Sequence, residues 1–203
     1  MSANNVPRGL PRGSRRQAGA AAVEFAIVAI VFFMLMFGIL ELARSMYLFN
    51  ALQDVTARAA NAASHVDFHD ASRLDTVRQD AIYRSGPGTL LLGDPVTDAN
   101  VRIDYLAATR GSDGTLALTP IPATALPSSP ARNRAICMGD PNDSTCIRFV
   151  RARICRSATG DSCAALRYQT VFPFITLPLN LPTAPTVVSA NSLGFVHGML
   201  PGT

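Results

Sequence analysis

The chain has 203 residues and a formal net charge of +4, and all 18 of its basic residues are arginine. That charge is confined to residues 1–19, which hold four arginines and no acid, because the remaining 14 arginines balance the 14 acids that follow. The greater part of the chain is therefore near neutral and has no basic cluster able to follow a phosphate backbone. Composition thus argues against nucleic-acid binding.

Residues 1–19, MSANNVPRGLPRGSRRQAG, form a leader rich in Gly, Pro and Arg. Such a composition buries too little apolar surface to fold by itself. The apolar run AAAVEFAIVAIVFFMLMFGIL follows over residues 20–40, and as a helix it reaches about 30 Å, the thickness of a bilayer's hydrocarbon core. Arginines on its N-terminal side predict a cytoplasmic N-terminus, with everything after Leu40 outside.

A cleaved secretory signal peptide is the competing interpretation of this run. Signal peptides have an apolar region of roughly 7–15 residues that ends in a small-residue cleavage site. This run is longer, and the A-x-A sequence at residues 60–62 lies well beyond it. A membrane span is therefore the favoured interpretation.

Helical periodicity continues after the span. Apolar residues recur every three or four positions at Leu42, Met46, Phe49, Leu52, Val55 and Ala59. One helix over residues 18–64 is predicted, of which residues 20–64 follow the leader. A second helix is predicted over residues 71–84, with Asp70 or Ser72 as its cap.

Strands and turns are predicted beyond Gly88. Residues 100–107 alternate polar and apolar side chains, and a Gly-Ser-Asp-Gly turn before residues 115–119 predicts a hairpin. Further strands are predicted over residues 146–155 and 168–177, whereas the proline-rich residues 120–134 and 178–186 are expected to be irregular. The predicted fold class is α+β: a long N-terminal helix, a second helix and a small antiparallel β-rich domain within residues 65–203.

Four cysteines fall within one short stretch: Cys137, Cys146, Cys155 and Cys163. An even number of cysteines in an exported domain predicts disulfides. Four cysteines allow three pairings, of which we favour Cys137–Cys146 and Cys155–Cys163, because each closes a short turn-rich loop. Zinc is the alternative, but the sequence lacks the C-x-x-C spacing and the nearby histidine of common zinc sites.

Other chemistry has weak support in the sequence. His65 and His69 have a spacing that binds metals on a helix, but they fall where a helix is expected to end, so a solvated linker is preferred. No nucleophile motif or phosphate-binding glycine loop is present, and we expect no enzyme activity, no metal and no cofactor. Phe172, Phe174 and Ile175 are expected to serve a core or an interface.

The stretch RRQAGAAAVEF, residues 15–25, resembles the processing region of type IV pilin-like proteins. The core AAVEFAIV and the downstream ALQDVTARAANAAS are similar to TadE-like minor pseudopilins of tight-adherence (Flp) pilus systems. The resemblance implies cleavage between Gly19 and Ala20, with Glu24 and Phe25 as the fifth and sixth mature residues. The choice between TadE-like and TadF-like stays open.

The resemblance also implies partners and a location. These are a prepilin peptidase, other pilins and pseudopilins, and the pilus assembly platform of the bacterial inner membrane, with the C-terminal domain in the periplasm. It implies a role in assembly or initiation of the pilus, for which Glu24 would meet the N-terminal ammonium of a neighbouring subunit. Two alternatives stay open: an unprocessed membrane-anchored binding domain, and an exported enzyme whose site the sequence does not reveal.

Overall fold

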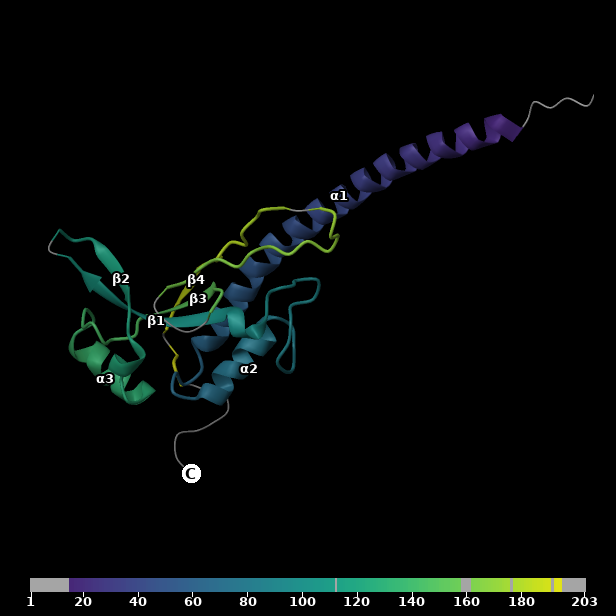
Figure 1. The fold of residues 1–203 in the computed structure, drawn as a ribbon. Coiled ribbons are helices and arrows are strands. Elements are labelled where there is room, and N and C mark those ends of the chain that lie inside the picture. The colour runs from purple at the N-terminus through teal and green to yellow at the C-terminus, as the bar shows by residue number, and fades with distance from the viewer. Residues whose placement is uncertain (1–14, 112, 158–161, 176, 191, 195–203) are drawn as a thin grey trace, which may run out of the picture. The chain divides into compact units, whose positions relative to one another are not determined.

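The computed structural model describes residues 15–111, 113–157, 162–175, 177–190 and 192–194. Over these residues the chain has three α-helices and one four-stranded antiparallel sheet, so the predicted α+β class is confirmed (Figure 1). It divides into two compact units, Met1–Ala43 and Arg44–Thr203.

Helix α1 (Arg15–Ala63) is 49 residues long. It contains no proline, so nothing removes a hydrogen bond from its backbone ladder. Its end is closed by the backbone N–H groups of Ser64 and His65, which donate to the carbonyls of Ala60 and Ala62. The single long helix predicted from the sequence is confirmed, with its start at Arg15.

The C-terminal part of α1 forms part of the core of the second unit. Its fully buried residues recur every three or four positions at Leu48, Leu52, Val55 and Ala59. Leu42 and Met46, which were expected to lie in this stripe, expose 54% and 60% of their surface. Leu42 lies roughly a third of a turn around the helix from Leu48 and Met46 nearly half a turn, so the predicted stripe is wrong at these two positions.

Helix α2 (Ala71–Ala81) begins where Asp70 accepts a hydrogen bond from the backbone N–H of Arg73 at 3.0 Å. This is the first of the two caps that the sequence allowed. Its predicted apolar face is buried and comprises Leu74, Val77, Ala81 and Ile82. The helix ends earlier than residue 84, because Tyr83 takes a left-handed conformation with φ of 62°.

The sheet has the strand order β2-β1-β3-β4, with antiparallel neighbours throughout. Strands β1 (Val101–Arg110) and β2 (Leu116–Pro120) form the predicted hairpin. At its turn the backbone N–H of Gly111 donates to the carbonyl of Thr115, and Gly114 supplies a positive φ of 83°. Strand β3 (Phe149–Ile154) lies within the predicted residues 146–155 and pairs with β1.

Strand β4 (Thr186–Ser189) and helix α3 (Pro130–Gly139) were not predicted. The irregular stretch 120–134 is wrong over its last residues, because Ser129 caps α3 and Pro130 occupies the first turn, where a missing N–H costs nothing. Asn133 holds α3 to the lead-in of β3: its side chain donates to the carbonyl of Ile147 and accepts from the N–H of Ile147.

The strand predicted over residues 168–177 is wrong. Within the described residues of this loop, its two arms meet at their base, where Arg167 and Asn180 form an isolated bridge. The backbone N–H of Tyr168 also donates to the carbonyl of Leu179 at 3.0 Å. Pro173 and Pro178 lack the N–H that a longer ladder requires.

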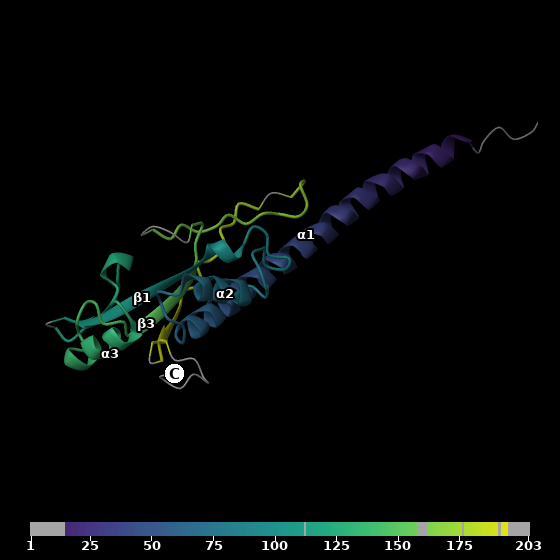
Figure 2. The same cartoon turned by 90° about the horizontal axis from the view of Figure 1, so that it is seen from below.

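The two faces of the sheet differ in what they contact. Figure 2 shows α2 and the C-terminal turns of α1 alongside β1 and β3, and side chains of these elements form the buried core. Core residues on the strands include Val101, Tyr105, Val150 and Ile154. The intervening positions of β1 and β3 point to the opposite face and carry arginines and one aspartate.

Candidate functional site

The N-terminal part of α1 presents large apolar side chains on all sides. Between Val23 and Leu40 the exposed ones range from 45% for Met36 to 75% for Phe25. A helix that is apolar all round is typical of an apolar environment rather than of a protein surface in water. By length and composition the helix could cross a membrane, with a mean hydropathy of 2.7 in its most apolar window.

Gly19 stands at the start of this apolar surface. A Cβ added to Gly19 would meet no atom within 4 Å, and the same holds for Gly38 further along the helix. Glycine inside a helix costs about 1 kcal/mol relative to alanine. Packing within the described residues therefore does not account for glycine at position 19, whereas a partner that approaches the backbone closely would.

Glu24 carries the single ionisable side chain between Gly19 and Leu40. It is exposed, and it follows Ala20 by four residues, or about 6 Å along a helix axis. A carboxylate inside a bilayer costs a few kcal/mol unless it is paired. Chemically, this segment can offer one anionic hydrogen-bond acceptor to a cation on a neighbouring helix.

Arg44 is the first residue of the second unit, and it binds two loops that are distant in sequence. Its Nε donates to the carbonyl of Leu92 at 3.0 Å and its Nη2 to that of Asp94 at 3.1 Å. Its Nη1 donates to the carbonyl of Gln169 at 2.6 Å and to the Tyr168 hydroxyl at 3.2 Å. Sequence reasoning assigned Arg44 no such role.

Asp104 on β1 is surrounded by three arginines on the face of the sheet away from the helices. Its Oδ1 accepts from Arg102, and its Oδ2 accepts from both Arg151 and Arg153. Burial alone would raise the pKa of Asp104, but the hydrogen bond from Arg102 and the charges of Arg153 and Arg102 outweigh it and lower the pKa. This cluster is a structural ion-pair network that the sequence did not reveal.

The two histidines weighed as metal ligands are held separately. His65 Nδ1 lies 2.6 Å from the Ser192 hydroxyl, and His69 Nε2 lies 2.7 Å from the carbonyl of Pro127. Across the described residues, His, Cys, Asp and Glu side chains gather nowhere in a group of three or more able to hold a metal ion. The geometry therefore offers no argument for a metal site there.

The four cysteines form two disulfides, Cys137–Cys146 and Cys155–Cys163. This is the pairing that the sequence favoured. The first ties α3 to the segment before β3, and the second closes the loop that follows β3. Cys146 and Cys155 are fully buried.

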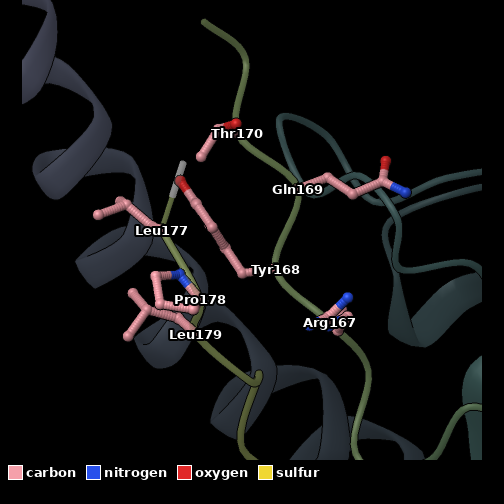
Figure 3. Close-up of a pocket in the computed structure, with 7 residues that line it drawn as sticks. All are labelled: Arg167, Tyr168, Gln169, Thr170, Leu177, Pro178 and Leu179. Carbon is pink, nitrogen blue, oxygen red and sulfur yellow. The ribbon is translucent and has the colours of Figure 1, made fainter. Parts of the chain in front are cut away.

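An open pocket of about 510 Å³ lies between the two arms of the loop over residues 167–179 (Figure 3). Arg167, Tyr168, Gln169 and Thr170 line it from one arm, and Leu177, Pro178 and Leu179 from the other. Tyr168 extends toward Leu177, whereas Gln169 points to the opposite side (Figure 3). The lining has no carboxylate, histidine or cysteine, so it presents no acid–base pair or nucleophile of the usual catalytic kinds.

These features define a class of protein: an N-terminal helix able to cross a membrane, continuous with a small disulfide-containing α+β unit. Residues 19–61 match the family model described as TadE-like protein. The match confirms the resemblance over this segment, which is the apolar helix and the part of α1 that follows it. No curated protein and no solved structure matches the chain.

Proposed function

We propose that this protein is a minor pseudopilin that acts in the assembly or initiation of a tight-adherence pilus after a prepilin peptidase cleaves it between Gly19 and Ala20. The observation that carries the proposal is the single carboxylate, Glu24, on the otherwise apolar and exposed stretch of α1 between Gly19 and Leu40, five positions after Gly19. The family match begins at Gly19, which supports the same boundary.

Cleavage would change the charge of the helix end. It removes residues 1–19 with their four arginines and leaves a new ammonium on Ala20. The Glu24 carboxylate of one subunit then pairs with that ammonium on its neighbour, because each charge would otherwise be costly in lipid. Small side chains at Ala20, Ala21, Ala22 and Ala26 allow two helices to approach closely. The charge pair would fix the axial register of the packed helices.

The proposed topology follows from the charges and the disulfides. The arginines before the span place the N-terminus in the cytoplasm, and the remainder of the chain lies in the periplasm. Two disulfides suit that oxidising compartment. The partners are then the prepilin peptidase, other pilins and pseudopilins, and the inner-membrane assembly platform, and the role is structural.

Cleavage is tested by co-expressing the full chain with a prepilin peptidase and measuring the N-terminus by Edman sequencing and intact mass. The expected product begins at Ala20. Gly19→Val should abolish the cut, because a branched side chain would stand beside the scissile bond. Gly38→Val is the matched control, since both glycines lie in α1 with open space around them. It should be cleaved normally.

A full-length N-terminus in the presence of an active peptidase would contradict the proposal. That result would favour the alternative, a membrane-anchored exported domain that binds an envelope partner without processing.

A further inference from the structure

Two loops of the second unit expose large apolar side chains. In the leucine loop, residues 89–97, Leu91 and Leu92 expose 65% and 66% of their surface, whereas Leu90 is buried in the core. In the phenylalanine loop, residues 169–175, Val171 and Phe174 expose 59% and 54%. Exposed apolar groups mark a surface that contacts something apolar where several of them lie in one region.

Leu92 is also unfavourable for the local backbone. Its φ is 54°, in the left-handed region where glycine and asparagine are preferred over branched apolar residues. The Leu92 side chain is two-thirds exposed, so packing in the core does not compensate for the strained conformation. A leucine at this position is explained if its side chain has an apolar environment outside the domain.

Arg44 holds both loops at the same place. One guanidinium donates to Leu92 and Asp94 in the leucine loop and to Gln169 in the phenylalanine loop. The Tyr47 hydroxyl adds a 3.4 Å contact to the carbonyl of Leu91. The backbones of both loops are therefore held at the first turn of the second unit.

The position of Arg44 in the sequence sets the depth of this turn relative to a membrane. It follows Leu40, the last residue of the apolar run, by four residues, which is about 6 Å of helix. The headgroup layer on each side of a bilayer is roughly 5–8 Å thick. If residues 20–40 span the hydrocarbon, the four-residue link keeps Arg44, and with it the loop carbonyls that it binds, near the headgroup layer, where arginine and tyrosine are favoured.

We propose that the leucine and phenylalanine loops insert Leu91, Leu92, Val171 and Phe174 into the outer surface of the phospholipid bilayer that α1 crosses. This inference rests on the membrane span in the proposed function. Lipid is the favoured occupant over a protein, because the chain itself carries the loops to the membrane surface through Arg44.

The absence of tryptophan from the chain makes single-tryptophan variants clean probes. Full-length protein is reconstituted in nanodiscs of phosphatidylethanolamine and phosphatidylglycerol, with or without bromine on the acyl chains. Phe174→Trp and Leu91→Trp report on the two loops, and Phe33→Trp reports on the span. Leu116→Trp on β2 is the matched control, because Leu116 and Phe174 are both 54% exposed.

Brominated lipid is expected to quench Phe33→Trp, Phe174→Trp and Leu91→Trp, with blue-shifted emission, and to leave Leu116→Trp unchanged. Quenching of Phe33→Trp without quenching of either loop probe would overturn the inference while leaving the span intact. Absence of quenching at Phe33→Trp would show that α1 does not cross the bilayer. The inference would then fail as well, whatever the cleavage assay shows. The loop probes could instead show blue-shifted emission that increases with the number of protein molecules per nanodisc and is not quenched by brominated lipid. That result would assign the loops to a contact with another protein and would also overturn the inference.

Discussion

Arg153 donates from Nη2 to Oδ2 of Asp104 at 2.7 Å, diagonally across the β1–β3 ladder, in which the residue opposite Asp104 is Arg151. The carboxylate thereby joins two arginines of β3, while Arg102 of β1 binds its other oxygen. The three arginine side chains expose only 12–20% of their surface. Among the described residues, Asp104 is the acid that compensates these three charges.

Asp104→Asn should therefore destabilise the domain. Removing the acid leaves three largely buried guanidiniums without this anionic partner, and breaking a buried ion pair costs about 3–5 kcal/mol. Thermal unfolding of the full chain in detergent, followed by circular dichroism, should show a clearly lower midpoint. Asp113→Asn, in the exposed β1–β2 turn, is the control and should change the midpoint little. An unchanged midpoint for Asp104→Asn would mean that the network does not stabilise the fold.

The same network predicts acid sensitivity. Asp104 has a pKa below its unfolded value of about 3.9, so its contribution is complete above that pH and is lost as the pH falls through the folded pKa. The wild-type midpoint should fall steeply below about pH 4. Asp104→Asn lacks the titrating group and should show a shallower fall in the same window. Parallel pH profiles for the two proteins would contradict this assignment.

Tyr105 and Tyr168 form a natural pair for a further prediction, since they are 7% and 6% exposed. The Tyr105 hydroxyl is buried and finds no hydrogen-bond partner among the described residues, and burial raises its pKa. The Tyr168 hydroxyl accepts from Arg44. Tyr105→Phe should be neutral or raise the free energy of unfolding by about 1 kcal/mol, because it removes an unsatisfied polar group.

Tyr168→Phe, by contrast, should lower the free energy of unfolding by about 1 kcal/mol through loss of the Arg44 hydrogen bond. Denaturant titration of both variants measures the difference. A loss for Tyr105→Phe as large as that for Tyr168→Phe would show that the Tyr105 hydroxyl does have a favourable partner.

The disulfides give another prediction. Each disulfide closes a short loop, with sequence separations of 9 and 8. A cross-link of that span restricts the unfolded chain, and the lost entropy raises the free energy of unfolding by about 2–3 kcal/mol. In the double variants Cys137→Ser/Cys146→Ser and Cys155→Ser/Cys163→Ser, the free energy of unfolding should fall by roughly that amount. Peptide mapping without reduction should recover the two short-range links. A crossed link such as one between Cys146 and Cys155 would contradict the pairing.

Local patterns were sufficient for the elements that depend on neighbouring residues. The hairpin follows from the alternation in residues 100–107 and the glycines of its turn, and the α2 face follows from the spacing of Leu74, Val77 and Ala81. Strand β4 was missed because prolines precede it and its four residues are ordered by pairing with β3. The buried stripe on α1 was misplaced because apolar residues also lie beside it, and only tertiary packing selects Leu48 over Met46.

Part of the candidate site could be predicted from the sequence and part could not. Gly19, Ala20, Glu24 and Phe25 lie in one short linear motif, so the sequence alone could propose them. The Arg44 contacts could not be anticipated, because they join residues 48 to 125 positions apart. The Asp104 network likewise depends on the register between β1 and β3, which sets arginines from different strands beside one carboxylate.

Glu24 gives the last prediction, which separates processing from assembly. Glu24→Ala removes the carboxylate but leaves Gly19 and Ala20 unchanged, so the mature N-terminus should still be Ala20 by intact mass. Pilus number, measured by shearing and electron microscopy, should fall, because the Ala20 ammonium of a neighbouring subunit loses its anionic partner in lipid. Val28→Ala is the matched control, since it truncates an exposed side chain one turn further along the same helix face. Wild-type pilus numbers in Glu24→Ala would rule out the register role of this carboxylate, whereas equal losses in both variants would show that helix packing in general, and not the charge, limits assembly.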